Sequence, residues 1–335
     1  IITSDWSSDV CSSDLPQPAG PGRPARLPSG ARVVLKIGSS SLTRDDGGLD
    51  LNRIDVLTRL IASLRHRGHD VVLVSSGAVA AGLPALGMEH RPTELRLLQA
   101  AASVGQGRLV ASWQTAMSAY GTVAAQVLLT AQDVAVRSHY RTVRATFDAL
   151  LTMGAVPIVN ENDAVATTEF SLGDNDRLAA LVSHLVTADV LVLLTDVDGV
   201  WTARPGTPGA RPLRYVAGGA DLAGVDVSDR GSALGTGGMR TKVQAATIAC
   251  ACGTATLIAR ADDAVPLLGG SALPDDLGTW LAPTGPHRPS RRLWMAYASV
   301  PEGRLLVDAG ASRALTVGKK SLLLPGNYQD RKSVV

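Results

Sequence analysis

Short apolar runs follow one another along the chain from residue 33 onward, separated by stretches in which apolar and polar residues mix. Six such runs cover residues 33–37, 71–74, 123–129, 156–159, 190–194 and 255–258. A short continuous apolar run is typical of a strand that is buried on both faces of a sheet. The sequence therefore predicts six buried strands.

Two of the intervening stretches carry apolar residues at helical spacing. After Asn52 these are Ile54, Leu57, Ile61 and Leu64, and after residues 174–176 they are Leu178, Leu181, Val182 and Leu185. Strands and helices thus alternate, which predicts an α/β fold, a three-layer αβα sandwich around a mostly parallel central sheet. Right-handed crossovers then place the carboxyl ends of the parallel strands along one edge of the sheet.

Polar loops follow four of these predicted strands. They comprise residues 38–41, 75–77, 160–163 and 195–199. Ligands of open α/β sheets bind just beyond the carboxyl ends of the strands, so we expect the four loops to meet at one cleft. Glycine, serine, asparagine and aspartate are also ordinary turn formers, which is the alternative for any one loop. Four polar loops together favour a ligand site.

Two glycine-rich segments each carry a lysine, Lys36 at the end of the first strand and Lys242 at the end of residues 235–242. The chain has five lysines and 27 arginines, and up to residue 318 these two positions alone keep lysine. A compact ammonium on a flexible stem suits a phosphoryl group whose geometry changes. The alternative is a lysine that reaches solvent at a strand end and another that caps a helix.

The common nucleotide-binding motifs are absent from the sequence. It contains neither Gly-x-Gly-x-x-Gly after the first strand nor Gly-x4-Gly-Lys-Ser/Thr, which disfavours a dehydrogenase and a P-loop NTPase. The glycines before Lys242 lead into a predicted helix, whose first N–H groups attract anions. Together with Lys36, Thr195 and Asp196, this segment predicts a nucleotide phosphate site.

A third polar cluster combines residues 160–163 with residues 173–176. Asparagine side chains and loop N–H groups can bind a carboxylate, and acidic side chains can bind an ammonium group or Mg²⁺. One of these residues is also suited to cap the helix that precedes Leu178. A helix cap needs only one of the three polar residues 174–176.

The composition is that of a globular protein, with 45% hydrophobic and 19% charged residues and a formal net charge of +2. It excludes wholesale disorder and lacks the basic excess of a dedicated nucleic-acid binder. No apolar run approaches the roughly 18 residues of a membrane span. Three cysteines, Cys11, Cys250 and Cys252, cannot form a disulfide framework, which predicts a reducing, cytoplasmic location. We expect Cys250 and Cys252 to pack in a buried helix rather than bind a metal.

The ends of the chain differ from its middle. Residues 1–30 have no helical or strand period and no signal-peptide pattern, which predicts a disordered leader. Residues 205–212 predict a surface loop or hairpin. A boundary is expected near residue 285, with the main domain at residues 31–283, a linker at 284–290, a small partial β-rich module at 291–328 and an unstructured tail at 329–335.

Seven motifs together resemble the amino acid kinase superfamily and, within it, the kinases that phosphorylate glutamate. They are VVLKIGSSSLT, VVLVSSGAVAAG, AASVGQGRL, VPIVNENDAVAT, LGDNDRLAAL, VLLTDVDGVWTA and LGTGGMRTK. The resemblance covers residues 32–283 and implies ATP-dependent phosphorylation of the γ-carboxylate of L-glutamate, the first step of proline biosynthesis. Residues 291–324 resemble the start of a PUA domain, a module of RNA-modifying proteins, which is too short here for RNA binding to be expected.

The resemblance also implies roles for individual residues. Lys36 and Lys242 would neutralise the transferring phosphoryl group, and Asp176 would hold the two lysines. Ser76, Asp163 and Asn175 would bind glutamate. ATP would be held, with Mg²⁺ bridging its phosphates rather than in a protein metal site, by Lys36, Gly38, Thr195, Asp196, Thr236, Gly237, Gly238, Met239, Arg240, Thr241 and Lys242.

The resemblance further implies a homo-oligomer, a dimer or tetramer, that proline inhibits. A glutamate side chain is already an anion at neutral pH, so such an enzyme needs no general base. One alternative is a sister kinase that acts on aspartate, N-acetylglutamate, carbamate or UMP, which the NEND and GDND runs disfavour. The other is a non-catalytic amino-acid sensor or RNA-binding protein, which has no use for two lysines of this kind.

Overall fold

The computed structural model describes residues 22–44, 48–130, 133–134, 136–165, 175–218, 222, 238–268, 270 and 272–285. All of them belong to one compact unit, residues 19–299. The predicted partial module and the tail lie outside the described residues. Residues 22–30 are part of the folded unit, because Leu27 is buried and the carbonyl of Ala25 accepts a hydrogen bond from the Leu273 N–H. The predicted leader therefore ends earlier than residue 30.

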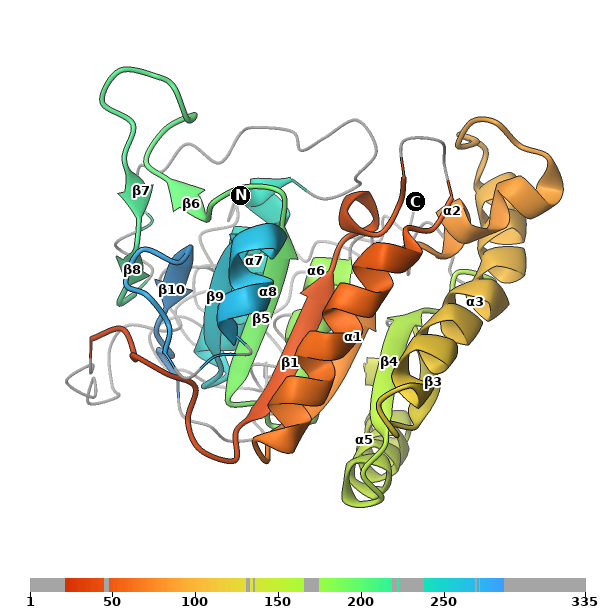
Figure 1. The fold of residues 1–335 in the computed structure, drawn as a ribbon, viewed down its shortest axis with the longest axis horizontal. Helices are drawn as coiled ribbons and strands as arrows, with labels where there is room; N and C mark the ends of the chain where they lie inside the picture. Colours follow the sequence, from red (N-terminus) through yellow and green to blue (C-terminus); the bar gives the residue numbers. More distant parts are fainter. Residues whose placement is uncertain are drawn as a thin grey trace, which may run out of the picture. The chain divides into compact units, whose positions relative to one another are not determined.

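The centre of the unit is an eight-stranded sheet in the order β3-β4-β2-β1-β5-β9-β10-β8 (Figure 1). Strands β3, β4, β2, β1, β5 and β9 are parallel to one another, and β10 is antiparallel to β9. The predicted strands are confirmed. In chain order the strands of the sheet are β1 (Arg32–Ile37), β2 (Asp70–Ser75), β3 (Ala124–Leu129), β4 (Val156–Glu161), β5 (Val190–Thr195), β8 (Tyr215–Val216), β9 (Ala255–Arg260) and β10 (Thr279–Leu281). Strands β8 and β10 were not predicted.

Helices cover both faces of this sheet, as the alternation predicted. One buried cluster joins side chains of α1, α3 and α8 to Val33 and Leu35 of β1, and the other joins α5, α6 and α7 to Val34. Figure 1 shows α1 and α8 across the nearer face. The helices are η1 (Ser39–Ser41), α1 (Leu51–His66), α2 (Ala78–Gly82), η2 (Pro84–Leu86), α3 (Leu95–Ser118), α5 (Arg137–Thr152), α6 (Asn175–Leu185), α7 (Met239–Ala251) and α8 (Ala261–Leu268).

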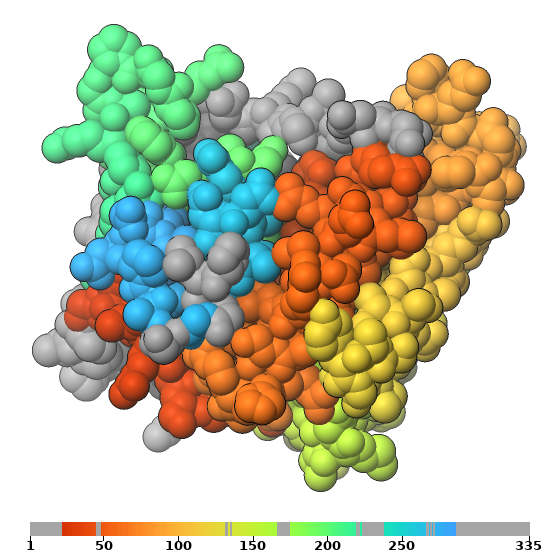
Figure 2. Space-filling view, in the orientation of Figure 1, coloured from red at the N-terminus to blue at the C-terminus, as the bar shows by residue number. Residues whose placement is uncertain are grey.

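A two-stranded sheet stands apart from the main one. Its strands β6 (Val200–Trp201) and β7 (Pro212–Leu213) pair antiparallel, so the residues between them form the predicted hairpin. The segment protrudes at one corner in both the ribbon and the space-filling view (Figures 1 and 2).

Strand β3 departs from the prediction of burial on both faces. Of its six residues only Leu129 is buried, and Gln126 is exposed. The reason is its place at the end of the strand order, where it pairs with β4. An edge strand is covered less completely than a central one.

Helix α3 packs unusually close to α2 because both contain glycine at the contact. A Cβ atom on Gly105 would lie 1.8 Å from the carbonyl oxygen of Ala78, and one on Gly82 would lie 2.0 Å from that of Ala101. Any side chain at either position would force the helices apart. The contact therefore fixes α3 against the chain that follows β2.

Candidate active site

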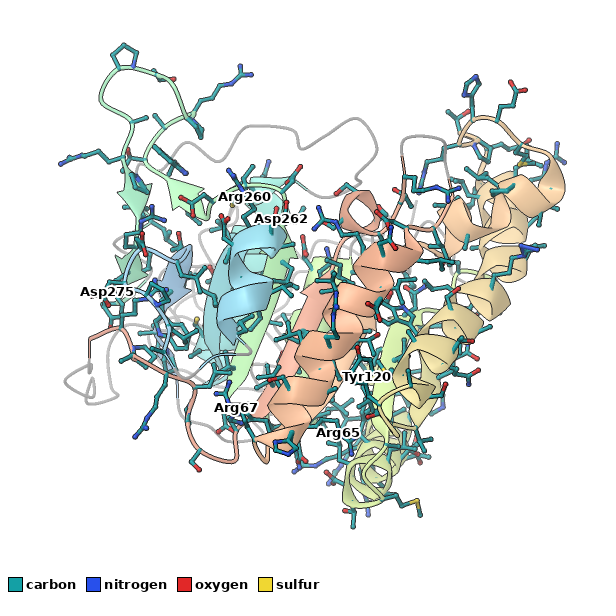
Figure 3. All side chains as sticks on the ribbon, viewed as in Figure 1. Arg65, Arg67, Tyr120, Arg260, Asp262 and Asp275 are labelled. Atoms are coloured by element: carbon teal, nitrogen blue, oxygen red, sulfur yellow. The ribbon has the colours of Figure 1, made fainter. Side chains whose placement is uncertain are left out.

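The carboxyl ends of β1, β2, β4 and β5 lie side by side at one edge of the sheet. Ile37 of β1 is level with Ser75 of β2 and Leu194 of β5, and β2 continues to β4. In Figure 3, Arg260 and Asp262 mark this end of the sheet where β9 ends, and Arg65 and Arg67 mark the opposite end. The four polar loops therefore come from adjacent strands, an arrangement compatible with the expected common cleft.

Lys36, Asp176 and Lys242 form a buried charged cluster at this edge. The Nζ of Lys36 lies 2.6 Å from Oδ1 of Asp176, and the Nζ of Lys242 lies 3.1 Å from Oδ2. The three residues come from the end of β1 and the first turns of α6 and α7. Asp176 is 0% exposed, Lys36 3% and Lys242 8%. Segments far apart in sequence thus place two ammonium groups on one carboxylate.

The charges of this cluster do not balance, because two ammonium groups face one carboxylate. Burial opposes ionisation of Asp176, but Lys36 and Lys242 outweigh it and hold the pKa of this carboxyl below its usual range. The three described residues of this cluster carry an excess of one positive charge in a poorly hydrated place when they are ionised. Such an arrangement is costly for folding alone and favours an anion at the same edge.

The start of α7 adds hydrogen-bond donors next to the cluster. Gly238 precedes the helix in an extended conformation, and no side chain of the described residues caps the helix there. The Thr241 hydroxyl donates to the carbonyl of Gly238 and lies 3.2 Å from Oδ2 of Asp176. Met239 and Arg240 open the helix, and Arg240 is exposed. The first N–H groups of a helix without a cap are suited to an anion.

Three further predicted nucleotide-binding residues, Gly38, Thr195 and Asp196, lie at the ends of the adjacent strands β1 and β5. A Cβ atom on Gly38 would lie 3.7 Å from Nζ of Lys36, so the lysine ammonium folds back beside this glycine. Thr195 is buried at the end of β5, and its hydroxyl donates to Oδ1 of the exposed Asp196 at 3.0 Å. Thr236 and Gly237 lie outside the described residues.

A second, uncharged cluster joins four side chains by hydrogen bonds. Nδ2 of Asn175 donates to the hydroxyl of Ser76 at 2.8 Å and to Oδ1 of Asn160 at 3.0 Å. Nδ2 of Asn160 donates to Oε1 of Gln106 at 2.8 Å. Asn175 and Asp176 are neighbours in the first turn of α6, so the uncharged cluster adjoins the lysine cluster.

The turn that carries Ser76 depends on the glycine after it. Gly77 has a φ of 108° and directly precedes α2. This left-handed conformation favours glycine, because a side chain there would meet the backbone. The turn brings the Ser76 hydroxyl to Asn175.

Asp163 lies just beyond β4 and has a strongly perturbed carboxyl group. Burial, followed by the negative charge of Glu161, raises the pKa of Asp163 to about 6, although Arg91 acts in the opposite direction. A positively charged ligand group next to this carboxyl would stabilise its ionised form.

Sequence reasoning assigned no role to Gln106, and it expected Asn160 only as one of the asparagines suited to a carboxylate. Asn160 stood in the polar run after β4, and Gln106 stood in the motif AASVGQGRL. The signal for Gln106 was its place between Gly105 and Gly107, since glycines within a helix indicate close packing.

The cysteines pack as predicted, because Cys250 is buried within α7 and Cys252 is buried directly after it. Burial raises the pKa of Cys250 to about 12, so its thiol is inert. Over the residues that the structure describes, no group of three histidine, cysteine or acidic side chains is arranged to hold a metal ion. Within the same residues, no helix is both long and apolar enough to cross a membrane.

Comparison with known proteins gives concordant matches. The amino acid kinase family matches residues 31–260. Glutamate 5-kinases from Streptomyces coelicolor, Salinispora arenicola and Bifidobacterium longum subsp. infantis are 52%, 50% and 47% identical over 296, 303 and 295 residues. These alignments cover 88%, 90% and 88% of this chain and 78%, 81% and 77% of the relatives.

A solved structure shares the fold. The carbamate kinase from Giardia lamblia bound to AMP-PNP superposes with a TM-score of 0.54 over 76% of this chain and 99% of that protein. The two sequences are 19% identical, so this likeness concerns the fold alone.

Proposed function

The chain belongs to the amino acid kinase family, and we propose that it transfers the γ-phosphoryl group of Mg-ATP to the γ-carboxylate of L-glutamate. The product is L-glutamyl 5-phosphate, and the reaction is the first step of proline biosynthesis. The observation that carries the proposal is the buried Lys36–Asp176–Lys242 cluster beside the polar Ser76–Asn175 pair. Relatives that are about half identical in sequence are glutamate 5-kinases.

The central obstacle to this reaction is electrostatic, because an anionic carboxylate must approach an anionic phosphate. Lys36 and Lys242 supply two positive charges at the point of transfer, and Asp176 holds both ammonium groups in place. Phosphoryl transfer depends mainly on alignment and charge stabilisation. With an unperturbed pKa near 4.3, the acceptor carboxylate is already ionised and needs no general base.

The acceptor is bound by Ser76, Asn175 and Asp163. Ser76 and Asn175 provide neutral hydrogen-bonding groups next to the lysine cluster. Asp163 pairs with the α-ammonium group of glutamate, which relieves the cost of its buried charge. Glutamate carries an ammonium group at one end and a carboxylate at the other. The ammonium group matches Asp163, and the carboxylate matches Ser76 and Asn175 beside the lysine cluster.

ATP is bound along Gly38, Thr195, Asp196 and the segment from residue 236 to Lys242. The fit rests on the excess positive charge of the cluster and on the uncapped start of α7. Mg²⁺ binds mainly to the phosphates of ATP and lowers their negative charge.

The alternatives are less well supported. A sister kinase for aspartate, N-acetylglutamate, carbamate or UMP would not share about half of its sequence with glutamate 5-kinases. A sensor or RNA-binding protein would gain nothing from two lysines buried on one carboxylate, which cost folding energy.

We also propose a homo-oligomer that works in the cytoplasm and binds proline at a site overlapping that of glutamate. The edge position of β3 supports a subunit contact, as do the exposed apolar residues Val123 (67%), which directly precedes β3, and Met153 (81%), which precedes β4. The two buried cysteines form no disulfide with each other, which is consistent with a reducing compartment. Light scattering tests the assembly, and competition between proline and glutamate tests the shared site.

The experiment that tests the function is ADP release from Mg-ATP with L-glutamate, aspartate, N-acetylglutamate, carbamate and UMP in parallel. Hydroxylamine is added to convert an acyl phosphate to a hydroxamate. We expect ADP and hydroxamate with glutamate only. Equal or greater turnover with another acceptor would identify a sister kinase, and no turnover from a folded protein that binds ATP would favour a sensor.

A further inference from the structure

Helix α3 contributes one polar side chain to the uncharged cluster, and the mechanism so far leaves it without a role. Gln106 lies between Gly105 and Gly107, and Gly105 is the point where α3 touches Ala78 of α2. Its side chain reaches Asn160 at the carboxyl end of β4. The helix is therefore held so that Gln106 meets the edge of the sheet where the acceptor binds under the proposed function.

The direction of every hydrogen bond in this cluster follows from one backbone group. The Glu161 N–H donates to Asn160 at 2.9 Å, and a backbone amide cannot reverse. The atom of Asn160 that faces it is therefore the carbonyl oxygen Oδ1. The amide nitrogen of Asn160 must then point to Gln106, which has to present its oxygen, Oε1.

The same reasoning fixes the two residues on the other side. Oδ1 of Asn160 also faces Asn175, so Asn175 must present its amide nitrogen. That nitrogen donates a second hydrogen bond to the Ser76 hydroxyl, which acts as an acceptor there. The hydroxyl hydrogen of Ser76 is consequently directed elsewhere, as a donor. A carboxylate, which only accepts hydrogen bonds, is the complementary ligand group.

Gln106 is held in this orientation at a cost. Its Nε2 atom is buried and makes no hydrogen bond within the part of the chain that the structure describes. An unpaired buried donor destabilises a fold, which indicates that folding alone does not explain the choice of residue.

We propose, on the basis of the function above, that Gln106 is a positioning residue for the acceptor amino acid. By accepting from Asn160, Gln106 holds the amide groups of Asn160 and Asn175 in the orientation that makes Ser76 a donor. Gln106 thus acts through Asn160 on the group that binds the substrate carboxylate. Gln106 therefore affects the binding of the acceptor amino acid and not the binding of ATP.

The test uses the full chain and compares Gln106→Met with Gln114→Met. Gln114 lies on the same helix and is exposed, so it controls for the change in composition. Gln106→Asn is a second variant, which stays polar but withdraws the amide by one methylene from Asn160. For each protein the KM for L-glutamate, the KM for ATP, kcat and the melting temperature are measured.

We expect either change at Gln106 to raise the KM for glutamate about tenfold or more, as for a lost buried hydrogen bond. The KM for ATP should stay within about twofold of the wild-type value, and Gln114→Met should match the wild type in both. Combining Gln106→Met with Asn160→Ala should raise the KM for glutamate no further than the larger single effect, because both changes break the same link.

Three results would overturn the proposal: an unchanged KM for glutamate in both Gln106 variants, an equal rise in both KM values, or strictly additive effects with Asn160→Ala. The last two would show a general or independent structural role. The turnover of the wild-type protein is measured first in the same assay. If the wild-type protein shows no glutamate-dependent turnover, the proposed function is refuted instead.

Discussion

Replacing Lys242 with methionine tests how much of the phosphoryl transfer depends on the buried lysine pair. Methionine keeps most of the volume of the side chain and removes its charge. Asp176 still has Lys36 at 2.6 Å, so the variant retains one intact ion pair. We therefore expect the protein to fold and the melting temperature to change little.

The expected loss of activity follows from the distances. Both lysine ammonium groups lie within 3.1 Å of the Asp176 carboxylate, so a phosphoryl group that contacts them meets two charges at similar range. A unit charge pair about 4 Å apart interacts by about 4 kcal/mol at an effective dielectric constant of about 20. Lys36 retains part of this stabilisation. About 3 to 4 kcal/mol at the transition state corresponds to a fall in kcat of about 100- to 1000-fold.

The assay is hydroxamate formation at saturating glutamate and Mg-ATP, with Gln244→Met as the control on the same helix. Gln244 is exposed, and its variant should keep the wild-type kcat. A Lys242→Met enzyme with a kcat within about threefold of the control would refute the role of Lys242. A comparable loss in both variants would show that the helix, and not the charge, had been disturbed.

Three further changes probe other parts of the account. Burial raises the pKa of Asp163 to about 6, and binding of the α-ammonium group of glutamate requires the ionised form of Asp163. We therefore expect kcat/KM for glutamate to rise as the pH increases through about 6. A pH profile that Asp163→Asn leaves unchanged would contradict this expectation. Asp176→Asn leaves two buried lysines without their carboxylate and should lower the unfolding free energy by about 3 to 5 kcal/mol in a urea titration; unaltered stability would exclude the charge argument. Gly105→Ala should destabilise the protein strongly, because the new Cβ would lie 1.8 Å from a carbonyl oxygen of α2, whereas Gly107→Ala meets nothing within 4 Å and should be neutral or stabilising in thermal denaturation; similar melting temperatures for both would rule out the close packing.

The central strands could be predicted because they are continuous apolar runs that two helical layers cover. The exposed face of β3 could not, since the sequence does not say which strand lies at an edge. Helix α3 also escaped prediction. Its contact with α2 depends on Gly105 and Gly82, and glycines weaken the apolar periodicity by which helices are recognised.

The charged part of the site could be predicted from the sequence, whereas of the uncharged part only Ser76, Asn175 and the polar run that contains Asn160 were expected, and their link to Gln106 was not. Lys36 and Lys242 stood out because the chain otherwise uses arginine for positive charge. The link from Gln106 through Asn160 and Asn175 to Ser76 spans four segments of the chain. Its bonds form only because α3, β4, α6 and the turn after β2 meet in three dimensions. No local pattern contains that information.

The most direct test of the central claim is to identify which carboxyl group of glutamate receives the phosphoryl group. L-glutamate labelled with ¹³C at its γ-carboxyl carbon is incubated with Mg-ATP and the enzyme, and hydroxylamine traps the product for ¹³C NMR. We expect the labelled resonance to move to that of a hydroxamate, in step with ADP release and only in the presence of ATP. ADP release with an unchanged γ-carboxyl resonance would contradict the account.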